Sequence, residues 1–425
     1  MYSSISANTQ AILLLTAPLL LGGSVPSVEL LKPSEYKKLA RYLREIKHEP
    51  ADLLSNDREK LIQRCSHLVA PNRMQLLIGR GFLLSQVLEQ WRSRSIWVLS
   101  RADSLYPKIL KKALREDAPA VLYGCGDVSL LNTGGLAVVG PRKTDNSLER
   151  FAFEVGKLCA ISNQTLISGG AKGIDLAAMT GAQENGGVVC NVMAEKLAKA
   201  AIDRSNRDNI LNNKLVLVSA YDPNAAFNAG HAMQRNKLIY GLSQAALVVD
   251  AMVNKGGTWA GAAEQLEKLN LVPVYVRGSG SKSEGLEALK RKGAMVWPDP
   301  INEEEFSKVL TYSSVLMPQQ VRVGITSSLF EASEDLSSSV AKPERFPVVG
   351  ISSDEVKDAN APKDRLFVFV KKLLTEMLNS PMSEAEIASE LNVSKLQARA
   401  WLSLLIQDES LVKLTNPVRY KVKNE

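Results

Sequence analysis

Glycines and cations gather in three short turns, each of which directly follows an apolar, strand-like run of the sequence. A glycine has no Cβ, so a ligand can approach the backbone N–H groups closely, and a neighbouring lysine or arginine adds positive charge. This combination is suited to binding phosphate. The candidate binding residues in these turns are Gly140, Arg142, Lys143, Ser168, Gly169, Gly170, Lys172, Gly173, Lys255, Gly256, Gly257 and Thr258. To these we add Arg235, Asn236 and Lys237, which precede a helical segment that leads into another strand-like run.

The spacing disfavours two common kinds of phosphate site. A P-loop requires GxxxxGK[ST], and the stretch GGAKGID lacks the final GK[ST]. A dinucleotide site requires GxGxxG after the first strand and an acidic residue about 20 positions further on, but Gly140-Pro141-Arg142 lacks the glycines and the second run ends in Ser168 and Gly169. Basic, glycine-rich turns without such acids are better suited to a phosphodiester backbone, and no cofactor is expected.

Six apolar runs alternate with helix-length segments between residues 134 and 312. The runs are LAVVG, QTLISGG, GVVCNVM, KLVLVSA, AALVVDA and VPVYVRG. This alternation indicates a parallel β-sheet covered by helices on both faces, which is a Rossmann-like α/β fold. The carboxyl ends of parallel strands lie on one edge of a sheet, so we expect the turns to converge on a single crevice.

The chain before the sheet domain is predicted to be mainly helical. Residues 1–100 are interpreted as a helical N-terminal domain, and residues 101–133 as a lead-in segment to the sheet domain. The apolar run Ala11–Val25 is interpreted as a buried helix and not as a targeting segment, because no Lys or Arg precedes it and proline and glycine interrupt it.

The C-terminal part of the chain is predicted to hold a second domain on a linker. Residues 313–362 are polar and Ser-rich, which is typical of a flexible linker. Residues 363–425 contain two helices capped by Ser383 and Ser394 and then two strands, the pattern of a winged helix-turn-helix. The second helix is basic and the first is acidic, so contact with DNA and contact with protein both stay open as its role.

The composition favours a globular protein with a polyanionic partner. The 425 residues carry a formal net charge of +7, and 45% of them are hydrophobic. The four cysteines are scattered without CxxC pairing, so we expect neither a zinc site nor a disulfide framework, but reduced thiols in a cytoplasm.

Taken together, the segments VVGPRK, LISGGAKGIDLAAMTGA, RNKLIYGLS and LVVDAMVNKGGTWAGA resemble, in order and spacing, the DNA-processing protein A (DprA/Smf) family. The resemblance is strong over Tyr106–Pro300. It implies a non-catalytic protein that binds single-stranded DNA through a Rossmann-like domain, forms a homodimer, and loads a RecA-type recombinase during natural transformation. No membrane contact is implied.

The same resemblance implies roles for particular residues. Arg142, Lys172 and Arg235 would contact DNA phosphates, Gly169, Gly170 and Gly173 would form a backbone cradle, and Asn236 and Lys237 would flank them. The sequence departs from the family pattern in the length of its Ser-rich linker and at two positions near the turns. Pro141 stands where the family commonly has Ser, and HAMQ precedes Arg235 in place of a form that contains FP.

A second hypothesis is a phosphoribohydrolase-like enzyme, which would cleave nucleoside monophosphates on a related sheet. Such enzymes typically use PGGxGTxxE, whereas KGGTWAG places Gly261 at the position of the glutamate, with Glu264 one turn further on. A carboxylate is needed there to activate water or to stabilise an oxocarbenium centre, so its absence argues against hydrolysis. Trp259 and Tyr240 could stack on bases or pack in the core, and both alternatives stay open.

Overall fold

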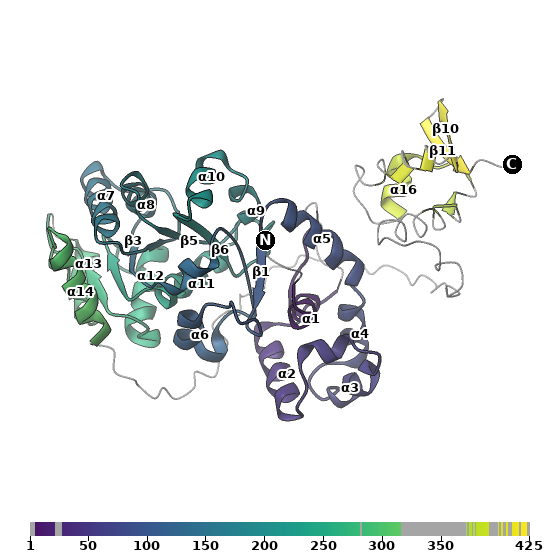
Figure 1. Ribbon diagram of the computed structural model, residues 1–425, viewed down its shortest axis with the longest axis horizontal. Coiled ribbons are helices and arrows are strands. Elements are labelled where there is room, and N and C mark those ends of the chain that lie inside the picture. The colour runs from purple at the N-terminus through teal and green to yellow at the C-terminus, as the bar shows by residue number, and fades with distance from the viewer. Residues whose placement is uncertain are drawn as a thin grey trace. The chain divides into compact units, whose positions relative to one another are not determined.

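The computed structural model describes residues 5–21, 28–280 and 283–315 and parts of 371–422 (Figure 1). The chain divides into two compact units, Met1–Asp335 and Leu336–Glu425, and each is described by itself. The predicted linker lies mostly outside the described residues, although the last described helix of the first unit continues through Val315.

The first unit is built on one nine-stranded sheet. Its strand order is β1-β2-β6-β5-β4-β3-β7-β8-β9. The strands are β1 (Trp97–Ser100), β2 (Val121–Cys125), β3 (Leu136–Val139), β4 (Leu166–Ser168), β5 (Val189–Met193), β6 (Leu215–Ser219), β7 (Ala245–Val248), β8 (Val274–Val276) and β9 (Met295–Val296). Strands β3 to β9 run parallel, which confirms the predicted α/β sheet. On one side of β3 lie β4, β5 and β6, and on the other lie β7, β8 and β9, so the strand order reverses at β3.

Strands β1 and β2 extend the sheet beyond the predicted Rossmann-like segment. They pair antiparallel with each other, and β2 pairs antiparallel with β6, with Tyr123 opposite Ser219. Every residue of both strands is buried. Their apolar character was visible in the sequence, but their partner is a strand about a hundred positions away, so the local pattern could not place them.

Helices cover both faces of the sheet, as Figure 1 shows. Leu215 and Leu217 of β6 join one core and Val216 and Val218 join the other, because successive side chains of a strand point to opposite faces. The first core is shared by the N-terminal helices with α7 and α8, and the second is covered by α6, α11, α12 and α13. The helices are α1 (Ala7–Thr16), α2 (Pro33–Glu45), α3 (Arg58–Arg64), α4 (Pro71–Ile78), α5 (Gly81–Ser93), α6 (Lys108–Leu114), α7 (Asn146–Ile161), α8 (Ile174–Glu184), α9 (Leu197–Ala200), α10 (Arg204–Leu211), α11 (Ala229–Leu242), α12 (Gly256–Glu264), α13 (Glu284–Arg291) and α14 (Glu303–Val315).

The first part of the apolar run Ala11–Val25 is a buried helix, as predicted, but the helix ends at Thr16, and residues 22–25 lie outside the described residues. Ser6 caps α1 by accepting a hydrogen bond from the Thr9 N–H, and residues 11–15 are all buried. In the part of the chain that the structure describes, no helix is both long enough and apolar enough to cross a bilayer. The four cysteines are buried and free, and burial raises the pKa of the Cys190 thiol to about 12.

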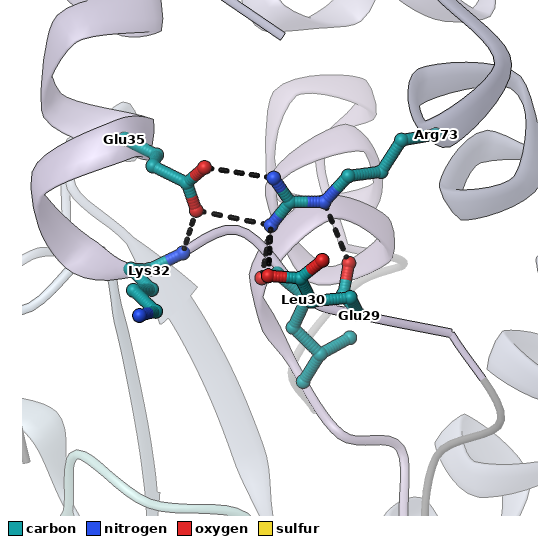
Figure 2. Close-up of polar contacts among 5 residues, drawn as sticks. All are labelled: Glu29, Leu30, Lys32, Glu35 and Arg73. Carbon is teal, nitrogen blue, oxygen red and sulfur yellow. Dashed lines mark hydrogen bonds and ion pairs between the residues drawn. The ribbon is translucent and has the colours of Figure 1, made fainter. Parts of the chain in front are cut away.

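Arg73 of α4 holds the chain that enters α2 (Figure 2). Its guanidinium donates to both carboxylate oxygens of Glu35, at 2.7 and 3.0 Å, and to the backbone carbonyls of Glu29 and Leu30. Glu35 also accepts a hydrogen bond from the Lys32 N–H at 2.8 Å, which completes the first turn of α2. The hydrogen bonds and charge of Arg73 lower the pKa of Glu35. Because Glu35 lies in α2 and Arg73 in α4, this bidentate pair fixes the position of one helix against the other.

Asp222 links the N-terminal helical region to the loop after β6 through hydrogen bonds. Its carboxylate accepts hydrogen bonds from the backbone N–H groups of Leu20 and Asn224, at 3.0 and 2.9 Å. The Asn224 amide in turn donates to the Leu20 carbonyl and to Gln90 of α5. Burial raises the pKa of Asp222 to about 6 in spite of these hydrogen bonds.

The second unit has its own small core. Strands β10 (Leu411–Thr415) and β11 (Val418–Val422) pair antiparallel, and α16 (Glu384–Glu390) precedes them. Ser383 caps α16, as predicted, because its Oγ accepts a hydrogen bond from the Glu386 N–H. The predicted helix start at Ser394 lies outside the described residues, so the winged helix-turn-helix stays a prediction.

The Asp222 carboxyl is expected to make the protein less stable as the pH rises from about 4 to 6. The folded protein retains this proton up to about pH 6, whereas an unfolded aspartate loses it near 3.8, so the folded state binds more protons in this window. The stabilisation of the folded state by this proton is fully present below pH 3.8. It amounts to roughly 3 kcal/mol, because the pKa of Asp222 differs by about two units between the folded and unfolded states. Urea unfolding of the parent and of Asp222→Asn at a series of pH values measures it. Parallel stability curves for the two proteins would contradict this assignment.

Candidate phosphate-binding site

The three glycine turns meet at the carboxyl edge of β4, β3 and β7, which are neighbours in the sheet. The Thr258 hydroxyl at the start of α12 donates to the Gly140 carbonyl at 2.8 Å. The Asn236 side-chain amide donates to the Gly257 carbonyl at 3.1 Å, which joins α11 to the same turn. The structure therefore brings the predicted residues together in one region.

A buried ion pair lies beneath the turns. Asp175 in the first turn of α8 is 5% exposed, Arg235 of α11 is 7% exposed, and their charged groups are 3.9 Å apart. The Asp175 carboxylate also accepts hydrogen bonds from the backbone N–H groups of Gly140, Gly169 and Ala171. One carboxylate thus joins the turns after β3 and β4 to α11. Asp175 is a site residue that was not predicted from the sequence, although it lies two positions after Gly173, the third glycine of the SGGAKG turn.

Arg235 is a buried residue and not an exposed one. Burial lowers the pKa of Arg235, although the negative charge of Asp175 opposes this shift. Burial raises the pKa of Asp175, although the positive charge of Arg235 opposes that shift. The Nε and Nη1 groups of Arg235 have no hydrogen-bond partner in the described part of the chain. The family resemblance assigns Arg235 to a DNA phosphate, and the structure places it under the surface of the turn.

Packing accounts for two of the predicted cradle glycines. A Cβ on Gly169 would lie 1.0 Å from Nη1 of Arg235, so only glycine allows the arginine to lie there. Gly170 has a φ of +64°, and a Cβ on it would lie 2.7 Å from Oδ1 of Asn191. Both glycines therefore have a reason in the packing and backbone geometry that does not depend on a bound phosphate.

The predicted cations separate into an exposed group and a buried group. Arg142, Lys143, Lys172 and Lys255 are exposed, and within the described residues none of them forms an ion pair. Lys237 is 5% exposed and lies 3.1 Å from Glu264. Ser168 is also buried and donates to the Val138 carbonyl at 2.7 Å. The outward charge of the site therefore comes from the four exposed side chains.

Two helices begin at this edge without a side-chain cap. The N-cap residues of α8 and α12 are Gly173 and Lys255, and neither makes a capping hydrogen bond. By contrast, Asp145 caps α7 and Asn228 caps α11. Uncapped helix N-termini present free N–H groups and a partial positive charge, which favours anions.

The aromatic side chains at the site differ from those that the sequence suggested. Trp259 and Tyr240 are 7% and 1% exposed and belong to the sheet core, so core packing accounts for both. Phe227 is 55% exposed, and the Arg142 guanidinium lies 5.7 Å from its ring centroid. The sequence signal that could have identified Phe227 as a site residue is its place as an aromatic residue in the polar loop before α11.

The geometry also bears on the hydrolase hypothesis. A Cβ on Gly261 would lie 2.7 Å from Nδ2 of Asn236, so a glutamate at this position would displace the amide that holds the third turn. Glu264, the next glutamate along the chain, is paired with Lys237. Neither position offers an unpaired carboxylate to activate water.

Comparison with known proteins finds relatives of the part of the chain that forms the sheet. The family model of DNA recombination-mediator protein A matches residues 97–307. The chain is 31% identical over 216 residues to DNA processing protein DprA of Streptococcus pneumoniae. This match covers 50% of this chain and 72% of that protein. The chain is also 28% identical over 293 residues to Protein Smf of Escherichia coli. This match covers 68% of this chain and 74% of that protein.

A solved structure supports the fold. The X-ray structure of DNA processing protein A from Streptococcus pneumoniae matches with a TM-score of 0.53 at 19% identity, over 72% of this chain and 98% of that chain. The chain belongs to the DNA processing protein A (DprA/Smf) family.

Removal of the Asp175 charge is expected to destabilise the whole site. Asp175→Asn would leave Arg235 buried without a counter-charge, which typically costs about 3–5 kcal/mol. Guanidinium unfolding of the variant measures the loss. The double variant Asp175→Asn/Arg235→Gln should recover part of it, because it removes the uncompensated charge as well. A loss below about 1 kcal/mol for the single variant would show that the pair does not hold the turns.

Proposed function

We propose that this protein binds single-stranded DNA at the carboxyl edge of β4, β3 and β7 and acts in DNA processing without catalysing a reaction. The observation that carries the proposal is the group of four exposed, unpaired cations beside two uncapped helix N-termini. Cations and backbone N–H groups recognise phosphates and carry no direct information about base sequence. Binding is therefore expected to have little sequence preference. Membership of the DprA/Smf family supports the same function.

Phe227 favours a single strand over a duplex. Its exposed ring lies beside Arg142, where the base of a nucleotide bound at the cation could stack on it. Stacking on an aromatic side chain requires a base with a free face, which a single strand offers and a paired, stacked duplex does not.

The wider role is proposed from the family resemblance. It comprises formation of a homodimer, loading of a RecA-type recombinase, and a part in recombination during natural transformation. Residues 363–425 are proposed to form a winged helix that contacts DNA or protein. Sedimentation of the full chain, with and without DNA and a RecA-type protein, tests these steps.

Lys172→Ala is expected to weaken single-stranded DNA binding equally for all sequences and to lower the salt slope of the affinity by roughly one unit. The matched control is Lys214→Ala, because Lys214 is also exposed and precedes β6 at the opposite edge of the sheet. Titrations at two salt concentrations with single-stranded DNA, duplex DNA and a mononucleotide measure the effect. Equal affinity for the mononucleotide and a long oligonucleotide would contradict the proposal and favour the enzyme hypothesis.

Gly257→Ala tests the approach of phosphate to the start of α12 without disturbing the fold. A Cβ on Gly257 would meet no atom closer than 3.6 Å, so the variant should fold normally, but its methyl group would add bulk in the first turn of α12, where a phosphate would approach. Binding should weaken by about tenfold, which corresponds to one charge-assisted hydrogen bond of about 1.4 kcal/mol. Gly81→Ala at the start of α5 is the control, because a Cβ there meets no atom within 4 Å. Unchanged affinity of Gly257→Ala would remove α12 from the binding site.

A further inference from the structure

We propose that a groove between α7 and α8 is a second nucleotide subsite, which takes the base of the nucleotide next to the one held at the glycine turns. This inference rests on the proposed function. The groove has a volume of about 390 Å³ and is lined from α7 by Arg150 and Phe153 and from α8 by Leu176 and Thr180. Its volume lies at the lower end of the range for small-ligand sites, which suits one nucleobase.

The groove is continuous with the phosphate-binding turns. Gly173 lines the groove and is also the N-cap of α8, and a Cβ on it would lie 2.6 Å from the Pro141 carbonyl of the first turn. Lys172, the residue before it, is one of the four exposed cations. When a phosphate of a DNA strand lies at Lys172, the next nucleotide of that strand therefore lies at the groove.

The chemistry of the groove favours a base over a phosphate. Leu176 is 49% exposed, and together with the half-buried Phe153 it forms an apolar wall of the groove. Arg150 at the rim is exposed and forms no ion pair within the described residues, so it can meet the phosphate that follows. Glu149 also lines the groove, and its negative charge disfavours a phosphate inside.

Close packing makes the groove rigid before any ligand binds. A Cβ on Gly156 of α7 would lie 1.9 Å from the Ala178 carbonyl, and a Cβ on Gly181 of α8 would lie 2.1 Å from the Phe153 carbonyl. The two helix backbones are therefore in contact, and neither can move towards the other to close the groove. A preformed surface of this kind binds with little ordering cost.

The test compares Leu176→Glu with the control Leu211→Glu in α10. Leu211 is also exposed, at 68%, and is not among the residues that line the groove. Leu176→Glu should weaken binding of a long oligothymidylate by about tenfold and leave binding of thymidine monophosphate unchanged, because only the longer ligand reaches the groove. Circular dichroism of both variants confirms folding. Ultraviolet crosslinking of the unaltered full chain to oligothymidylate should also attach DNA to the peptide that contains Phe153.

Two outcomes would overturn the subsite. The first is unchanged affinity of Leu176→Glu for the long oligonucleotide together with no crosslink in α7 or α8. The second is a change in oligomeric state of Leu176→Glu at unchanged DNA affinity, which would make the groove a contact between copies of this chain. Loss of single-stranded DNA binding by the unaltered protein is a different result, because it contradicts the proposed function itself.

Discussion

The buried contact between Asp175 and Arg235 is the constraint on which the site depends. The Asp175 carboxylate lies where the backbone amides of two turns converge, and it accepts hydrogen bonds from them while it balances the charge of Arg235. Such a pair is costly to desolvate, and it persists because the turn amides satisfy the remaining oxygen lone pairs. The turns after β3 and β4 and the first part of α11 are therefore held in one arrangement.

This arrangement separates the cations by role. Arg235 and Lys237 lie on the buried side of α11, and each has a carboxylate partner, Asp175 or Glu264. The exposed cations lie on the loops above and have no carboxylate partner among the described residues, so their charge is available to a ligand. A buried layer that is neutral overall thus supports a surface layer that is positive. The pairing with Lys237 also occupies Glu264, the next glutamate after Gly261, which stands at the glutamate position of the hydrolase pattern PGGxGTxxE.

The N-terminal helices contribute to the rigidity of the sheet. They share a core with α7 and α8, and Asp222 and Asn224 link the loop after β6 to Leu20 and Gln90. This loop leads through Phe227 to α11, which carries Arg235. The helical region and the candidate binding edge are therefore connected through a few buried polar contacts.

The sequence by itself determined the parallel sheet and the three turns, because these depend on local patterns of apolar residues and glycine, whereas the order of the strands in the sheet came from the structure. It also identified the cations that surround the turns. Only the tertiary structure decided which of them are exposed, since burial of Arg235 and Lys237 depends on carboxylates from α8 and α12 that are distant in the sequence. The same holds for Gly169, whose lack of a side chain is explained by an arginine 66 positions away. The exposure of Phe227, the burial of Trp259 and the pairing of β2 with β6 likewise arise from long-range packing, which periodicity along the chain does not report.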